Sequence, residues 1–112
     1  MEKFKIGDIV LVLFPFSNLK GQKLRPALVV AYAEFNNVIL CQITSRPYSS
    51  KTAIKLTMGE FAEGKLPITS YIRPDKLFTA ESSIIQKVAG KLTPKKKQNI
   101  LAVMRKMFNE NK

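Results

Sequence analysis

Short apolar runs separated by turn-forming residues dominate the first 92 residues of the chain. The runs that we expect to be strands cover residues 7–12, 24–30, 38–44, 52–56, 68–73, 75–79 and 84–92. The run over 38–44 is too apolar and β-branched for anything but a mostly buried strand. Residues 58–66 are predicted to be irregular. Short strands at roughly ten-residue spacing predict a small β-barrel.

The pattern changes at Thr93-Pro94, where an N-cap hydroxyl precedes a proline at the first helical position. From here the apolar period is helical, and the stripe predicted to pack against the barrel is Ile100, Leu101, Met104, Met107 and Phe108. The predicted fold class is therefore mainly β with a C-terminal helix, and residues 1–112 are expected to form a single domain. Lysines 95–97 leave two interpretations open, a phosphate-binding role and a solvated face.

An arginine stands at the mouth of the second predicted strand. Arg25 follows a predicted polar loop over residues 17–23, and Pro26 fits only the first residue of a strand or an edge position. A position where a loop meets a rigid sheet is a common place for chemistry. Arg25 is therefore a candidate functional residue.

The charge points to an anionic partner. Nineteen Lys and Arg against eight Asp and Glu give a net charge of +11, which attracts polyanions. Nucleic acid is the leading partner class, although acidic proteins fit equally well and excess lysine can simply solubilise a surface. No targeting segment or membrane-spanning stretch of roughly 18 apolar residues is seen, so we expect a cytosolic protein with no membrane partner.

The residue types exclude most hydrolytic sites. The chain has no histidine, and its single cysteine, Cys41, lies in an apolar run that predicts a buried structural thiol. A disulfide, a His-based zinc site and a Ser-His-Asp triad are excluded, and we expect no cofactor and no metal. RNA can supply its own nucleophile, the 2′-hydroxyl. An arginine and a threonine, such as Arg25 and Thr44, would then be sufficient residue types to bind the phosphate. Such residues at strand ends are, however, more often structural.

Several segments together resemble the MazF/PemK toxin family of type II toxin–antitoxin systems. The matching motifs are Gly-Asp-Ile-Val-Leu-Val at 7–12, Phe-Pro-Phe-Ser at 14–17, Arg-Pro-Ala-Leu-Val-Val at 25–30, Gln-Ile-Thr-Ser at 42–45 and Leu-Pro-Ile-Thr-Ser-Tyr-Ile at 66–72. The resemblance implies a small SH3-like β-barrel and a homodimer. It also implies a metal-independent endoribonuclease that cuts single-stranded mRNA at short sequences, leaves 2′,3′-cyclic phosphate and 5′-hydroxyl ends, and is inhibited by an acidic antitoxin protein.

The resemblance also assigns roles by position. Arg25 looks like the catalytic arginine that stabilises the pentavalent phosphate, Thr44 like its hydroxyl partner, and Ser45 could substitute or assist. The loop over residues 17–24 looks like the segment that gates the RNA groove. The residues expected to bind RNA are Phe16, Ser17, Lys20, Lys23, Arg46, Tyr48 and Lys76.

Some of these roles have alternatives. Phe16 and Tyr48 could stack on bases or lie at the rim of a dimer. Lys76 stands near a position where some members carry glutamine, and it could hold a phosphate instead of reading a base. Two further functions stay open: a basic barrel that binds RNA or DNA without cutting it, and a gyrase-directed inhibitor, whose expected tryptophan-containing tail this chain lacks.

Overall fold

Ten elements make up the computed structural model, which describes residues 3–15, 22–48 and 50–109. The strands are β1 (Asp8–Pro15), β2 (Gln22–Ala33), β3 (Asn37–Thr44), β4 (Ile54–Leu56), β5 (Phe61–Gly64), β6 (Ser70–Glu81) and β7 (Ile85–Leu92). Two 3₁₀ turns, η1 (Met58–Glu60) and η2 (Ser82–Ile84), precede β5 and β7, and α1 (Pro94–Met107) follows β7. The region predicted to be irregular thus contains η1 and β5.

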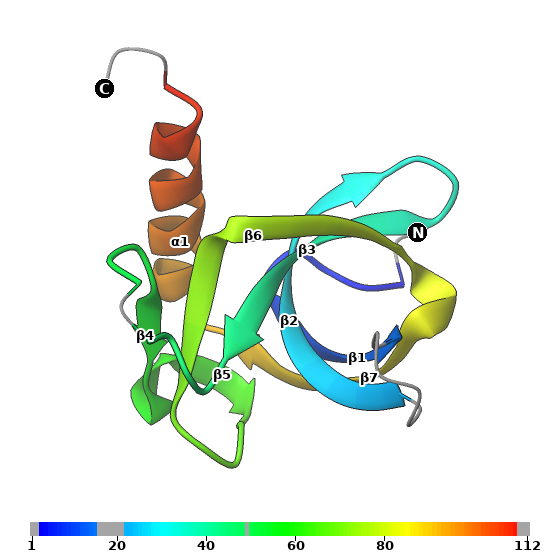
Figure 1. Ribbon diagram of the computed structural model, residues 1–112, viewed down its shortest axis with the longest axis horizontal. Helices are drawn as coiled ribbons and strands as arrows, with labels where there is room; N and C mark the ends of the chain where they lie inside the picture. Colours follow the sequence, from blue (N-terminus) through cyan, green and yellow to red (C-terminus); the bar gives the residue numbers. More distant parts are fainter. Residues whose placement is uncertain (1–2, 16–21, 49, 110–112) are drawn as a thin grey trace.

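The seven strands form one antiparallel sheet in the order β4-β6-β3-β2-β1-β7-β5. The sheet curls into a half-barrel, and α1 stands beside β6 (Figure 1). The prediction of a mainly β, barrel-like fold with a C-terminal helix is confirmed. No helix in the described part of the chain is long and apolar enough to cross a membrane.

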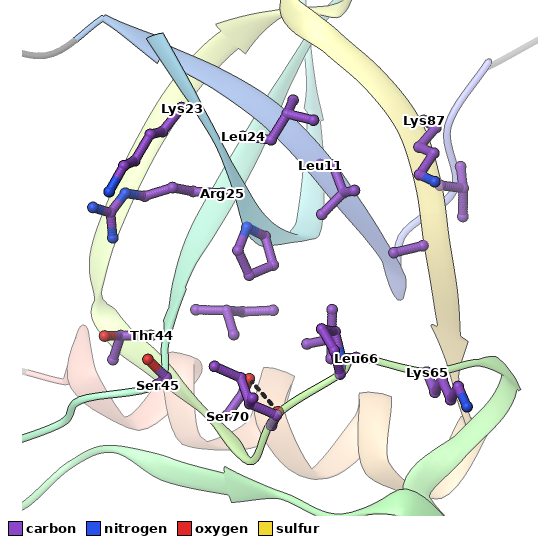
Figure 2. A pocket seen from close by; sticks show the side chains of 16 residues that line it. Leu11, Lys23, Leu24, Arg25, Thr44, Ser45, Lys65, Leu66, Ser70 and Lys87 are labelled. Atoms are coloured by element: carbon purple, nitrogen blue, oxygen red, sulfur yellow. Dashed lines mark hydrogen bonds between the residues drawn. The ribbon is translucent and has the colours of Figure 1, made fainter. Parts of the chain in front are cut away.

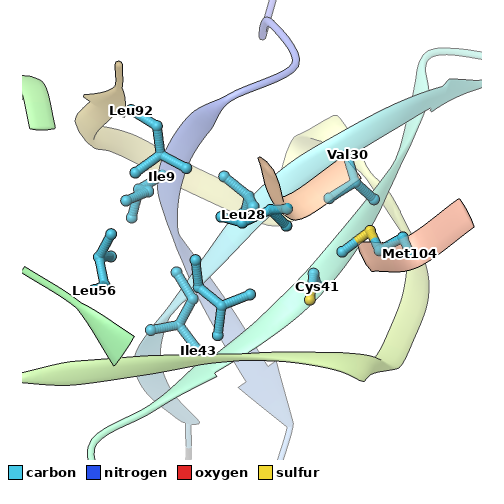
Figure 3. Packing of buried hydrophobic residues seen from close by; sticks show 10 residues of the cluster. Ile9, Leu28, Val30, Cys41, Ile43, Leu56, Leu92 and Met104 are labelled. Atoms are coloured by element: carbon cyan, nitrogen blue, oxygen red, sulfur yellow. The ribbon is translucent and has the colours of Figure 1, made fainter. Parts of the chain in front are cut away.

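Both faces of the sheet are buried. Ile9 and Leu28 belong to a cluster that includes Ile100 and Met104 of α1 (Figure 3), whereas their neighbours Val10 and Val29 belong to a second cluster on the other face. Because successive side chains of a strand point to opposite faces, a strand buried on both sides reads as a continuous apolar run. This arrangement explains the continuous apolar run over residues 38–41.

The turn before β1 ties three strands together. Gly7 has a φ of +101°, its N–H donates to Val29 O at 2.9 Å, and its carbonyl accepts from Leu92 N at 3.0 Å. The next residue, Asp8, is 3% exposed, and its carboxylate accepts from Lys5 N and from Lys91 Nζ, each at 3.0 Å. The Gly-Asp pair therefore fixes the start of β1 between β2 and β7.

The second strand begins earlier than predicted. Gln22 pairs with Pro15, so residues 22–24 belong to β2 and not to a loop. Pairing with the end of β1 extends this hairpin beyond the local sequence signal. Pro26 is not the first residue of the strand, but pairing between β2 and β3 starts only at Ala27, so Pro26 lacks a β3 partner in the register. Pro26 therefore occupies an edge position, as predicted, on the side of β2 that faces β3 but not on the side that pairs with β1.

Pro74 bends a strand instead of ending one. The two strands predicted on either side of it are the single strand β6, whose register to β3 shifts between Cys41, opposite Leu77, and Ile43, opposite Ile72. The Cys41 thiol is fully buried and donates to Arg73 O at 2.8 Å within this shift. Burial raises the pKa of Cys41 to about 12, so the prediction of a buried structural thiol is confirmed.

The helix begins as predicted, with the Thr93 hydroxyl accepting from Lys96 N at 3.2 Å. Ile100 and Met104 are buried, but Met107 is 37% exposed and Phe108 is 71% exposed, so the prediction that these two pack in the core is wrong. The last turn of α1 extends beyond β6 (Figure 1), and Phe108 caps the helix rather than lying in it.

Of the three lysines that open the helix, Lys96 has a structural role. Its ammonium group lies 3.0 Å from Glu60 Oε2 and donates to Lys55 O at 3.2 Å, which links α1 to η1 and β4. The Lys97 side chain lies against Gly7, within the space that a Cβ atom at that glycine would need. Lys95 is exposed.

Candidate functional site

A pocket of about 560 Å³ opens where β2, the end of β3, β7 and the segment between β5 and β6 meet. Its size is that of an ordinary ligand site. The apolar part of the lining, which we call the floor, includes Leu11, Pro26, Ile43, Leu66, Pro67 and Ala89. Charged and hydroxyl-bearing side chains stand around this apolar floor (Figure 2).

One wall of the pocket comes from the first part of β2. Lys23 and Arg25 are two residues apart on this strand and so point to the same side of the sheet. They pair with Phe14 and Val12 of β1, in the stretch where β2 has no partner in β3. Lys23 is exposed and Arg25 is half-buried. The early start of β2 therefore holds both cations on rigid sheet rather than on a loop.

Two hydroxyl groups stand at the end of β3. Thr44 Oγ1 accepts from Arg46 N at 3.1 Å and its O–H donates to Arg46 O at 3.4 Å, so the turn that follows the strand orients the Thr44 hydroxyl. Ser45 is exposed beside it. Figure 2 shows both residues below Arg25 on the same side of the pocket. Arginine N–H groups and hydroxyl groups that face one space can donate to the oxygens of a single phosphate.

The structure brings together only part of the predicted site. Lys23, Arg25, Thr44 and Ser45 all line the pocket. The predicted RNA-binding residues Phe16, Ser17 and Lys20, and most of the predicted gating loop, lie outside the described residues.

Three other predicted RNA-binding residues lie outside the pocket lining. Arg46 holds Thr44 through its backbone, as described above. Tyr48 is 84% exposed with a φ of 54°, in a turn that Ser50 N closes by donating to Pro47 O at 3.0 Å. Lys76 is exposed on β6, next to an Arg73–Asp75 ion pair of 3.2 Å.

The pocket also contains polar residues that the sequence reasoning missed. Lys65 precedes the Leu-Pro-Ile-Thr-Ser segment, Lys87 lies on β7 opposite Leu11, and the buried Ser70 hydroxyl donates to Ile68 O at 3.0 Å. No local signal distinguishes Lys65 and Lys87 among 19 Lys and Arg residues, because only the folded sheet brings them to the pocket. Ser70 lies within the motif at residues 66–72 that contributes to the family resemblance, and this was the only feature of the sequence that indicated a place near the site.

The electrostatic character of the pocket is cationic. Lys23, Arg25, Lys65 and Lys87 line it, and within the described ranges 3–15, 22–48 and 50–109 no Asp or Glu does so. Cations around a partly enclosed apolar floor focus the field and concentrate anions there. The arrangement can bind a phosphate-bearing ligand.

A comparison with known protein families gives a match over most of the chain. A family model described as a PemK-like, MazF-like toxin of type II toxin-antitoxin system matches residues 5–108. A comparison with curated proteins finds no match.

Among solved structures, the chain is similar to an endoribonuclease in complex with its cognate antitoxin from Mycobacterial species, with a TM-score of 0.65, 16% identity, and 96% of this chain and 93% of that chain covered. It is also similar to MazF in the MazE-MazF structure (Form-III) from Deinococcus radiodurans, with a TM-score of 0.69, 18% identity, and coverages of 90% and 92%. Mycobacterium tuberculosis toxin MazF-mt6 gives a TM-score of 0.68 at 16% identity, with coverages of 90% and 95%. At these identities the likeness shows the fold, and the family model supplies the membership. The chain belongs to the PemK-like, MazF-like toxin family of type II toxin–antitoxin systems.

Proposed function

We propose that this protein is a metal-independent endoribonuclease that cleaves single-stranded mRNA at short sequences. The observation that carries the proposal is the meeting of Lys23, Arg25, Thr44 and Ser45 around one cationic pocket. Family membership and the endoribonuclease relatives with this fold support it. The net charge of +11 supports this substrate class, because it attracts a polyanion such as RNA.

In the proposed reaction the RNA supplies the nucleophile. The 2′-oxygen attacks the adjacent phosphorus and loses its proton to water, the bond from phosphorus to the 5′-oxygen breaks, and that oxygen takes a proton from water. The products are a 2′,3′-cyclic phosphate and a 5′-hydroxyl. No histidine or carboxylate lines the pocket in the described part of the chain, so this route demands the least of the protein.

Arg25 binds the scissile phosphate in this proposal. Its planar guanidinium donates two parallel hydrogen bonds to the phosphate oxygens and stabilises the extra charge of the pentavalent intermediate. The Thr44 hydroxyl keeps the bond from Arg46 N, exchanges its long bond to Arg46 O for one to the same oxygens, and Ser45 assists. Lys23 binds a neighbouring phosphate.

The proposed partners are an acidic antitoxin and a second copy of the chain. Solved relatives are complexes of an endoribonuclease with its cognate antitoxin and of MazE with MazF. An acidic segment fits the cationic pocket for the same reason that RNA does, so we infer that the antitoxin and RNA compete for it.

Cleavage of a long single-stranded RNA by the purified protein in EDTA tests the proposal. The wild type should cut at a recurrent short sequence and leave cyclic phosphates. Arg25→Ala should cut at least about 100-fold more slowly. Arg105→Ala, which removes an exposed arginine on α1, is the matched control and should cut normally.

Two results oppose the proposal. Cleavage that survives in Arg25→Ala would exclude this arginine as the catalytic group. If the wild type binds RNA without cutting it, the protein is a nucleic-acid-binding module and not an endoribonuclease.

A further inference from the structure

The pocket has a second cationic wall. Figure 2 shows Lys65 and Lys87 on the side opposite Lys23 and Arg25, with Leu11 and Leu66 between the two sides. Lys87 comes from β7 and Lys65 from the segment between β5 and β6, so neither belongs to the elements that carry Arg25 and Thr44. We propose that Lys65 and Lys87 bind the RNA backbone beyond the scissile phosphate, so that the strand crosses the apolar floor with phosphates held on both sides. This inference rests on the proposed function.

The sheet register sets the spacing of the two walls. Leu11 of β1 pairs with Pro26 of β2 on one side and with Lys87 of β7 on the other. Neighbouring strands lie about 4.8 Å apart, so the backbones at Pro26 and Lys87 are about 10 Å apart. A segment of several nucleotides is long enough to place different phosphates at the two walls.

The floor explains why the phosphates must lie at the walls. Leu11, Pro26 and Ile43 offer no side-chain hydrogen-bond donor, and a phosphate placed over them would lose its solvation without compensation. The flat faces of bases, in contrast, lose little by contact with an apolar surface. An occupant with a charged backbone and apolar flat faces therefore fits the pocket better than a purely acidic chain.

Both lysines are available for this role. Lys65 and Lys87 are exposed, and in the described ranges neither takes part in an ion pair. Lys91 and Lys96, by comparison, lie 3.0 Å from Asp8 and Glu60 and are committed to the fold. Lys65 and Lys87 are not committed to the fold in this way, and their place in the pocket lining allows them to contact a ligand.

Binding of an uncleavable probe tests the inference independently of catalysis. The probe is a mixed-sequence, 2′-O-methylated single-stranded oligonucleotide, titrated at several salt concentrations. Each phosphate contact on a single strand contributes about 0.7 to the slope of log affinity against log salt, so Lys65→Gln/Lys87→Gln should lower the slope by about 1.4. The matched control, Lys5→Gln/Lys106→Gln, removes the same charge from exposed positions outside the pocket and should leave the slope near that of the wild type.

The outcomes separate the two proposals. If the pocket double variant and the control lose the same affinity and slope while both melt like the wild type, the second wall is excluded. If the salt slopes of the wild type and the two double variants differ as expected but the wild type cuts no RNA, the proposal that Lys65 and Lys87 bind the backbone is supported and the proposed endoribonuclease activity is excluded. If the wild type cuts RNA, the double variant should raise KM at least tenfold and leave the single-turnover rate at saturating RNA within about threefold, because its lysines lie away from the reacting phosphate.

Discussion

The Asp8 carboxylate and the Lys91 ammonium group lie 3.0 Å apart and join the start of β1 to β7. Asp8 is almost fully buried, whereas the Lys91 side chain is 40% exposed. The Asp of the Gly-Asp-Ile-Val motif thus stabilises the sheet and takes no part in the pocket.

Lys91→Gln should destabilise the protein by about 1–2 kcal/mol in urea unfolding at pH 7, because it leaves a buried carboxylate without its counter-charge and water screens part of the effect. The hydrogen bond to Asp8 and its negative charge raise the pKa of Lys91. The stabilisation is therefore complete below the ordinary lysine pKa of about 10.4 and is lost as the pH rises through the higher folded value. The difference in unfolding free energy between the wild type and Lys91→Gln should therefore narrow above about pH 10.5.

Lys106→Gln serves as the control for this prediction. A difference in unfolding free energy that stays constant with pH would show that the ion pair with Asp8 is not the cause of the stabilisation.

Thr44→Val should reduce RNA cleavage by about 10²-fold or more, because it removes one donor to the phosphate at nearly constant side-chain shape. Thr44→Ser keeps both the hydroxyl and the contact with Arg46 N and should stay within about tenfold of the wild type. Single-turnover rates at saturating RNA measure the effect. Equal rates for the two variants would remove Thr44 from the catalytic groups.

Cys41 should be inert in the folded protein. Burial raises the pKa of its thiol to about 12, chiefly because water is excluded from the site, so almost no thiolate is present at pH 8. Iodoacetamide should label Cys41 at least about 10³-fold more slowly in the native protein than in denaturant, since labelling has to wait for opening of the fold. Rapid native labelling at pH 8 would contradict the buried hydrogen bond to Arg73 O.

The turn between β2 and β3 carries strain that a substitution should relieve. Phe35 and Asn36 have φ values of 60° and 63°, a backbone that favours Asn and Gly, and the Phe35 ring is 90% exposed. Ser82 fixes the turn through its N–H and hydroxyl, which donate to Asn36 O at 3.2 and 2.8 Å. Phe35→Asn should therefore stabilise the protein by about 0.5–1 kcal/mol in thermal unfolding. Phe35→Ala removes the ring without relieving the backbone, and an equal gain for both variants would argue against strain.

Two glycines of one short segment should respond differently to alanine. A Cβ atom on Gly64, which has a φ of +71°, would clash with Ala89 O, whereas one on Gly59 would meet nothing within 4 Å. Gly64→Ala should cost at least about 2 kcal/mol of unfolding free energy, because it adds a backbone clash to the strain of a positive φ. Gly59→Ala should change it by less than about 1 kcal/mol. Similar values for the two variants would contradict the close approach of β5 to β7.

The sequence predicted the features that depend on a few neighbouring residues. The start of α1 follows from one hydroxyl and one proline, and the buried strand β3 follows from its apolar run. The motifs predicted Arg25 and Thr44 at strand ends, and Thr44 does end β3, but Arg25 is the fourth residue of β2. The exposure of Met107 and Phe108 was not predictable in the same way, because helical period says which side of a helix is apolar but not where the covering sheet ends.

The sequence by itself determined the strand-rich pattern, the helix, the cationic character and the family of the protein. Each of these features depends on short segments of the chain or on its composition. Only the tertiary structure decided that β6 continues through Pro74, that β2 reaches back to Gln22, and that Lys65 and Lys87 line the same pocket as Arg25. These features depend on the register between strands that are far apart in sequence. Register is set by packing on both faces of the sheet together, and no local window of residues contains that information.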